Sequence, residues 1–264
     1  MSGVGLVVNG DLLSDDRYVS GVVHALGDRL TEAGTRLIVR VADSAESESD
    51  IYHFWHASGG PDAVALIGAT GDDPRVSLLR RLGTPFAAVA DRSRVDDFSA
   101  VIVDNIAMVD EIRRFLASKG YTRAIYVTGF EENDAGGVRA AAFDDGNDDV
   151  EVVRSDRGVD ATVRAAVAAL RDDISAVIFD TDAAAVAALD AFRAIDKRIP
   201  EDVAILSWTD SLLCQSSEPP ITALNQRATE TGSLLAECVL RTLDSPRPVV
   251  LNAPPPTVVE RESA

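Results

Sequence analysis

Short apolar runs recur along the chain, and most are separated by segments whose apolar residues fall on one helical face. Short uninterrupted apolar runs bounded by turn residues are typical of strands that are covered on both faces of a parallel sheet. The expected strands are Gly5–Val8, Leu37–Val41, Ala63–Ile67, Phe86–Val89, Ala100–Val103, Ala124–Thr128, Glu151–Arg154, Ala176–Phe179 and Val203–Leu206. Strands that alternate with helices predict an α/β fold with doubly wound parallel sheets.

The segments between these strands predict amphipathic helices. The first keeps one face apolar from Tyr18 to Ala33, and Gly34 is placed to end it. Further helices are expected at 108–116, 161–170, 183–195 and 229–243. Nine strands are many for one sheet, and the neutral break near residues 119–122 divides them into two groups. We therefore expect two lobes.

Two apolar stretches near the end of the chain finish in polar residues. "IPEDVAILSWTDS" (199–211) leads into Trp208 and Thr209, and "SEPPITALNQ" (217–226) leads into Gln226. In an open parallel sheet, ligands bind in the crevice beyond the carboxyl ends of the strands. The two stretches therefore predict strands that bring these side chains to a ligand site.

The charge balance restricts the partners. The chain has 25 basic and 43 acidic residues, a formal net charge of -18, and this field repels the phosphate backbone of DNA. Because there is no long apolar stretch and no apolar leader at the N-terminus, we expect a cytoplasmic protein without a membrane partner. Cys214 and Cys238 have no metal-ligand or redox spacing, and we expect both to be core residues.

Motifs for catalysis or cofactors are weak. The glycines at 3, 5 and 10 lie before and inside a strand, whereas a dinucleotide fingerprint places them in the turn after it. There is no phosphate-binding loop and no Gly-x-Ser-x-Gly elbow. We therefore expect neither a cofactor nor an enzyme, although pairs of acidic residues keep general acid–base catalysis open as an alternative.

Two segments could bind metal ions. His53 and His56 share a helical face, but no third ligand accompanies them, and the helix is expected to pack Ile51, Phe54 and Trp55 inward. "DDGNDD" (144–149) lacks the length of a calcium loop and its closing Glu, so a solvated turn is favoured. We expect no metal site.

Residues 198–240, "RIPEDVAILSWTDSLLCQSSEPPITALNQRATETGSLLAECVL", resemble the effector-binding domain of the lactose-repressor (LacI-type) family of bacterial transcription regulators. That family shows a Pro-Glu-Asp-Val start, a strand ending in Gly-Phe/Tyr-Asp-Asp, and a Pro-Pro-Leu-Thr-Thr-Val-x-Gln hinge. "GLVVNG", "VIVDN", "LASKGYTRAIYVTG" and "AVIFDTDAAAVAAL" agree with it in order, so the likeness covers almost the whole chain.

The resemblance implies a periplasmic-binding-protein-like fold of two lobes joined by three crossovers, with a small-molecule effector between them. Its crossovers would place residues 1–120 plus 228–251 in the N-terminal lobe, and residues 121–227 plus 252–264 in the C-terminal lobe. It places the ligand-binding residues at Asn9, Asn105, Asp134, Thr181, Asp182, Trp208, Thr209 and Gln226. The Trp208 ring is expected to stack on a sugar, and polar side chains to bind its hydroxyls. It also implies a homodimer, for which apolar helix faces at 22–30 and 76–82 are expected to be left over. Operator DNA would be bound only through a helix-turn-helix, which normally precedes the first strand and is absent here.

The expected site departs from the family pattern. Ser207 replaces a Gly, Thr209 an Asp and Thr181 an Asn, while Asp134 aligns with the Arg three residues before the Gly of Arg-Leu-Ala-Gly-Phe. Loss of a bidentate Arg favours neutral or amine-bearing effectors over sugar phosphates. A solute-binding protein of a transporter, with the same fold and closure, stays open as the alternative function.

Overall fold

The computed structural model describes residues 3–9, 17–69, 73–92, 97–129, 135–144, 149–245 and 247–264, without the side chains of Asn9 and Ala135. The chain divides into two compact units. Unit 1 consists of Met1–Asp104 and Arg227–Pro254, and unit 2 consists of Asn105–Gln226 and Pro255–Ala264.

Unit 1 is built on a parallel sheet of six strands in the order β11-β5-β4-β3-β1-β2. Its elements are β1 (Gly3–Asn9), α2 (Arg17–Glu32), β2 (Arg36–Ala42), α3 (Ala45–Ser58), β3 (Ala63–Ala69), α4 (Pro74–Leu82), β4 (Phe86–Asp91), β5 (Ser99–Val103), α10 (Ala228–Asp244) and β11 (Val250–Asn252). Alternate residues of each central strand point to opposite faces, so both faces need a helical cover.

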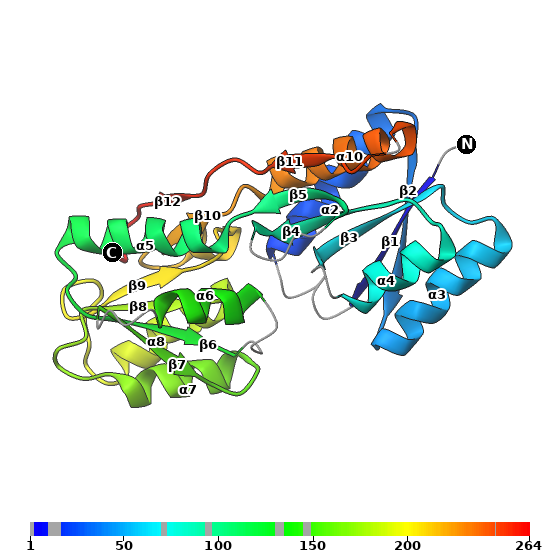
Figure 1. Ribbon diagram of the computed structural model, residues 1–264. Coiled ribbons are helices and arrows are strands. Elements are labelled where there is room, and N and C mark those ends of the chain that lie inside the picture. Colours follow the sequence, from blue (N-terminus) through cyan, green and yellow to red (C-terminus); the bar gives the residue numbers. More distant parts are fainter. Residues whose placement is uncertain are drawn as a thin grey trace. The chain divides into compact units, whose positions relative to one another are not determined.

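Within unit 1, helices α2 and α10 cover one face of the sheet, and α3 and α4 cover the other (Figure 1). In β3, Ala63 and Ala65 pack with Leu26 and Leu235, whereas Val64 and Leu66 belong to the core under the other two helices. The sheet is therefore buried on both sides, as its uninterrupted apolar runs predict.

The contact between α2 and α10 is unusually close. A Cβ atom at Gly232 would lie 2.3 Å from the carbonyl oxygen of Val22, and one at Gly21 would lie 3.0 Å from Ala228 Cβ. This packing buries Val22 and Leu30 completely. The expectation that the apolar face at 22–30 is left over for a dimer is therefore wrong, because α10 covers it within the same unit.

The second face expected to be spare is also used inside unit 1. Val76 and Leu79 of α4 are fully buried in the core beneath α3. Helix α3 turns Tyr52 and Trp55 inward, and Ile51 packs partly buried against the same core. Phe54, by contrast, is 63% exposed, so its expected inward packing is wrong.

Unit 2 is built on a sheet in the order β12-β10-β9-β8-β6-β7, in which only the β10–β12 pair is antiparallel. Its elements are α5 (Asn105–Lys119), β6 (Ala124–Thr128), α6 (Ala135–Phe143), β7 (Val150–Arg154), α7 (Val159–Ala169), β8 (Ala176–Phe179), α8 (Asp182–Arg193), β9 (Ala204–Ser207), α9 (Leu212–Ser216), β10 (Thr222–Asn225) and β12 (Thr257–Val259). Helices α7 and α8 cover one face of this sheet, and α5 and α6 lie on the other (Figure 1).

The nine strands expected from the apolar runs and the strand within 217–226 are all present, and the α/β class is confirmed. The division between the units lies at Asp104/Asn105, before α5, whereas the expected boundary follows residue 120. Helix α5 belongs to unit 2 because it packs against α6 and β12.

Candidate functional site

Three neighbouring strands of unit 2 end side by side in polar or aromatic residues. Thr128 ends β6, Asp180 directly follows β8, and Trp208 directly follows β9. The strand register pairs Val127 with Phe179 and Phe179 with Ser207. Thr128, Asp180 and Trp208 each directly follow one of these paired residues, so they lie next to one another across the three strands. This is the carboxyl edge of the sheet, where open α/β sheets bind ligands.

Asp180 is the centre of this edge. Its Oδ1 accepts a hydrogen bond from the Tyr126 hydroxyl at 2.6 Å, and its Oδ2 accepts one from Thr128 Oγ1 at 2.7 Å. Arg139 Nη2 lies 2.9 Å from Oδ1 and forms an ion pair. Asp180 is 5% exposed and Arg139 is 7% exposed, so both charges are buried and each compensates the other.

Burial, and then the charge of Asp180, raise the pKa of Tyr126 well above its usual value. Its hydroxyl therefore stays protonated and acts as a donor to the carboxylate throughout the physiological range. Tyr126, Thr128, Arg139, Asp180 and Trp208 together form what we call the Asp180 cluster.

Trp208 forms the apolar side of the cluster. The Arg139 guanidinium lies over its ring, with Cζ 4.8 Å from the centroid, and the rings of Tyr126 and Phe143 pack at 5.8 and 6.2 Å. Its side chain is fully buried, so no face of the ring is open to solvent here. The indole Nε1 has no hydrogen-bond partner within the described part of the chain. The stacking expected from the sequence therefore requires a neighbour to move.

Arg139 is one of the cluster residues that were not expected from the sequence. It lies on α6 three residues before Ala142-Phe143, so "RAAAF" (139–143) fits the family's Arg-x-x-Gly-Phe spacing with Ala in place of Gly. The aromatic residue after the small one could have identified this alignment. Asp134, which was aligned with the Arg instead, lies outside the described residues.

Gln226 joins the ends of β9 and β10. Its Nε2 donates to the carbonyl oxygen of Trp208 at 3.2 Å and contacts Thr209 Oγ1 at 3.3 Å. The structure thus brings together three residues expected at the site. Asp210, one residue further, is paired at 2.7 Å with Arg261 from the C-terminal segment.

Thr181 and Asp182 begin α8. The Thr181 hydroxyl accepts from the Ala184 amide at 3.3 Å and caps the helix, so its oxygen has a structural use. Asp182 is 3% exposed; its Oδ1 accepts from the Ala183 amide, while Oδ2 has no hydrogen-bond partner in the described part of unit 2. A buried carboxylate oxygen without a hydrogen-bond partner is expected to accept a hydrogen bond from a ligand or from water.

The other two expected residues come from different units. Asn105 is the first residue of α5 in unit 2 and is 5% exposed. Asn9 is the last residue of β1 in unit 1, and its side chain is outside the description.

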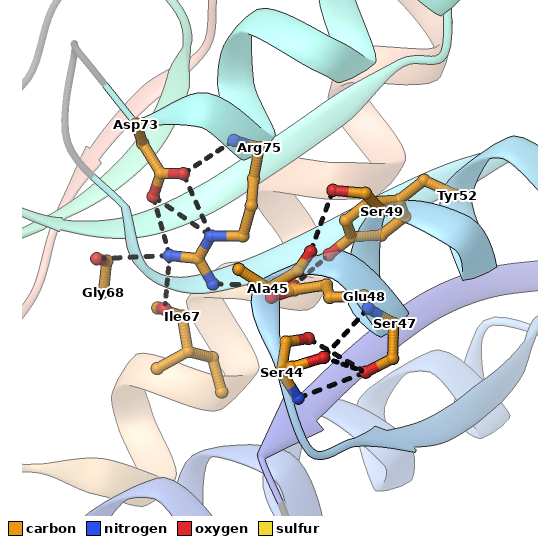
Figure 2. Close-up of polar contacts among 10 residues, drawn as sticks. All are labelled: Ser44, Ala45, Ser47, Glu48, Ser49, Tyr52, Ile67, Gly68, Asp73 and Arg75. Carbon is orange, nitrogen blue, oxygen red and sulfur yellow. Dashed lines mark hydrogen bonds and ion pairs between the residues drawn. The ribbon is translucent and has the colours of Figure 1, made fainter.

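A second, partly buried ionic network lies in unit 1 at the carboxyl end of β3 (Figure 2). Asp73 caps α4 and binds Arg75, with Oδ2 2.7 Å from Nη2. Arg75 also lies 3.7 Å from Glu48 Oε1, which accepts a hydrogen bond from the Tyr52 hydroxyl at 2.6 Å. Burial raises the pKa of Tyr52, and Glu48 raises it further, so this phenol also stays protonated.

Other features do not coincide with these edges. A pocket of about 170 Å³ opens in unit 1 at the amino ends of β3 and β4, and none of the expected site residues lines it. No cluster of three or more His, Cys, Asp or Glu side chains suited to a metal ion occurs among the described residues, which include His53 and His56 but not 145–148. In the same part of the chain, no helix combines the length and the apolar character needed to cross a membrane.

Comparison with known proteins identifies the fold and the family. A family model described as a periplasmic binding protein-like domain matches residues 114–264, more than half of the chain. The LacI family transcriptional regulator from Bifidobacterium animalis subsp. lactis DSM 10140 has a TM-score of 0.89 at 29% identity, covering 99% of this chain and 97% of that one. A CelR–cellobiose complex has the same fold, with a TM-score of 0.85 at 24% identity, covering 100% of this chain and 85% of that one.

The relatives in sequence are transcriptional regulators. The HTH-type transcriptional regulator CelR of Thermobifida fusca is 29% identical over 252 residues, which are 90% of this chain and 73% of CelR. The ribose operon repressor of Escherichia coli strain K12 is 25% identical over 197 residues, which are 70% of this chain and 59% of the repressor. The chain therefore belongs to the periplasmic binding protein-like domain family, and is a ligand-binding domain of the LacI type of transcription regulator.

Proposed function

We propose that this domain senses a small polar effector and dimerises, so that it controls a DNA-binding domain to which it is joined. The observation that supports effector binding best is the Asp180 cluster: a buried, hydrogen-bonded group of polar side chains at the carboxyl edge of unit 2. The effector would bind against this edge, in the cleft that the family resemblance places between two lobes.

Two buried atoms favour a hydroxyl-bearing ligand. The Nε1 of Trp208 is a donor that needs an acceptor, and the Oδ2 of Asp182 is an acceptor that needs a donor. Leaving either unsatisfied costs about 1–3 kcal/mol. A sugar hydroxyl can donate and accept, so a ligand with several hydroxyls could satisfy both atoms directly or through water.

The relatives suggest which ligands to test first. A CelR protein has been solved with cellobiose, and another relative is a ribose operon repressor. We therefore choose a sugar panel of cellobiose, glucose and ribose.

The test of effector binding is a thermal-shift screen with this sugar panel, followed by calorimetry. A ligand at a hundred times its dissociation constant adds about 2.7 kcal/mol to the free energy of unfolding. We expect at least one sugar to stabilise the protein, with a smaller shift in Trp208→Phe, which keeps an aromatic ring but loses Nε1. His53→Ala, a change on an exposed helix position of unit 1, is the control. If the hit responds equally to both variants, the placement at unit 2 is wrong.

DNA binding is assigned to a helix-turn-helix outside these residues. The aligned regions cover 73% of CelR and 59% of the ribose repressor, and the net charge of -18 on the whole of this chain opposes contact with phosphates. We expect no measurable retention of operator DNA by this chain alone near physiological salt. Tight, salt-sensitive retention in a gel shift would contradict this assignment.

The proposed dimer uses apolar side chains that both units leave exposed. In unit 1, Val39 and Val41 on the edge strand β2 are 38% and 60% exposed. In unit 2, Leu212 and Leu213 of α9 are 80% and 41% exposed. Unprotected edge strands and exposed apolar patches invite association, and a second copy of this chain is the partner we propose.

A further inference from the structure

The arginine of the Asp180 cluster has its charge compensated within the protein. Arg139 is 7% exposed, and its guanidinium lies 2.9 Å from Asp180 and over the Trp208 ring. A buried arginine beside the carboxyl end of a strand would otherwise attract a carboxylate or phosphate through a bidentate contact. Here the carboxylate is supplied by the protein itself.

Asp180 is not needed for the local backbone structure. Thr181, the next residue, already caps α8, and the Asp180 side chain instead accepts from Tyr126, Thr128 and Arg139, which come from β6 and α6. A buried ion pair adds little to stability compared with apolar residues of the same volume. A role in recognition explains the carboxylate better than a role in folding does.

We propose that Asp180 determines the charge of the effector: by neutralising Arg139 it makes the site select neutral hydroxyl-bearing ligands and reject their anionic counterparts. This inference rests on the proposed function, since it assigns specificity to the same site.

A second carboxylate lies nearby. Asp182, also buried, follows two residues after Asp180 at the carboxyl end of β8. An anionic ligand would therefore lose the attraction of Arg139 and be repelled by the carboxylate of Asp182. A neutral sugar meets no such repulsion, and its hydroxyls can still bind the indole N–H and the second carboxylate.

Unit 1 shows the same arrangement independently. Arg75, at the carboxyl end of β3, is bound by Asp73 and lies near Glu48, so two carboxylates also surround one guanidinium there (Figure 2). Arg92, which follows β4, is 2.8 Å from Asp104. Arg139 and Arg75, from helices, and Arg92, directly after a strand, each lie beside the carboxyl end of a strand and are paired with an acid, which is consistent with a ligand that carries no negative charge.

The experiment compares matched ligands that differ by one charge. Each sugar of the panel is paired with its uronic acid, in which oxidation of the terminal CH2OH group gives a carboxylate and the ring stays closed, and dissociation constants are measured by calorimetry at fixed ionic strength. Wild-type protein should bind the neutral member at least about tenfold more tightly. In Asp180→Asn, which keeps the size and one acceptor, the ratio of the two constants should move toward the anion by about tenfold.

Asp172→Asn is the matched control. It removes one negative charge from the same unit, but Asp172 is fully exposed and lies 3.6 Å from Lys197. In this variant the ratio of the two dissociation constants should stay at the wild-type value. A changed ratio would reveal a general effect of net charge.

Each outcome decides the question. An unchanged ratio in a folded Asp180→Asn protein, or an equal change in Asp172→Asn, would overturn the role of Asp180 while effector binding stands. If Asp180→Asn does not fold, tighter binding of the anion by wild-type protein still refutes the proposal, and tighter binding of the neutral sugar supports it. Binding of neither member to either protein would overturn the proposed function and this inference with it.

Discussion

Arg139 contacts Trp208 and Asp180 at once: its Cζ lies 4.8 Å from the indole centroid, and its Nη2 lies 2.9 Å from the carboxylate. Removing the cation in Arg139→Met leaves Asp180 buried without a counter-charge. We expect unit 2 to lose about 3–5 kcal/mol of unfolding free energy. The measurement is urea denaturation followed by Trp208 emission in a Trp55→Phe background.

The double variant Arg139→Met/Asp180→Asn tests the reason for that loss. Because it also removes the uncompensated charge, it should recover about 2 kcal/mol relative to Arg139→Met alone. If the double variant is as unstable as the single one, packing of the arginine stem, not charge compensation, is what stabilises the cluster.

Ligand binding should be visible through one of the two tryptophans. Trp208 is in the Asp180 cluster, whereas Trp55 packs in the core of unit 1 against Tyr52. We expect the emission change on binding a sugar to persist in Trp55→Phe and to disappear in Trp208→Phe. A response that is lost in Trp55→Phe instead would place the effector elsewhere.

The strands and most helices could be predicted from the sequence because burial on both faces leaves uninterrupted apolar runs. The short strands β11 and β12 could not, since three residues form a strand only where a partner offers its edge, β5 in one case and β10 in the other. The spare apolar faces were overestimated because the pattern of α2 cannot reveal that α10, two hundred residues later, covers it.

Part of the candidate site also follows from the sequence. Trp208, Thr209 and Gln226 were expected together because two successive strands end there, and their contacts through Gln226 agree. Arg139 and Asp180 were missed. Arg139 could have been identified from the spacing of "RAAAF", but its ion pair with Asp180 joins α6 to the end of β8, and no local pattern predicts that contact.

The two thiols should be inert in the folded protein. Burial raises the pKa of Cys238 to about 12 and also raises the pKa of Cys214, so the thiolate that reacts is scarce at both positions. With an aromatic disulfide reagent at pH 8, we expect almost no reaction until denaturant is added, and then two thiols per chain. A fast reacting thiol under native conditions would show that one of these cores opens readily.

Sedimentation should show twice the mass of one chain at tens of micromolar. Val41→Lys and Leu212→Glu place a charge on the two proposed dimer surfaces, so each should shift the equilibrium toward the monomer. Phe54→Lys is the control, because Phe54 is equally apolar and 63% exposed but lies outside both surfaces. A wild-type monomer at this concentration, or equal weakening by all three, would count against the proposed dimer.

Because α2 and α10 cross closely, alanine substitution should have different effects on stability at two glycines of these helices. A Cβ at Gly232 would lie 2.3 Å from the Val22 carbonyl oxygen, which belongs to the backbone and cannot rotate away, whereas one at Gly27 would meet only Leu37 Cδ2 at 3.5 Å. Gly232→Ala should therefore cost unit 1 about 1–3 kcal/mol or more, the usual range for overpacking. Gly27→Ala, in the interior of α2, should be neutral or stabilise by about 0.5–1 kcal/mol through helix propensity. Urea denaturation followed by far-ultraviolet circular dichroism measures both, and similar free energies for the two variants would mean that the helices can separate at little cost.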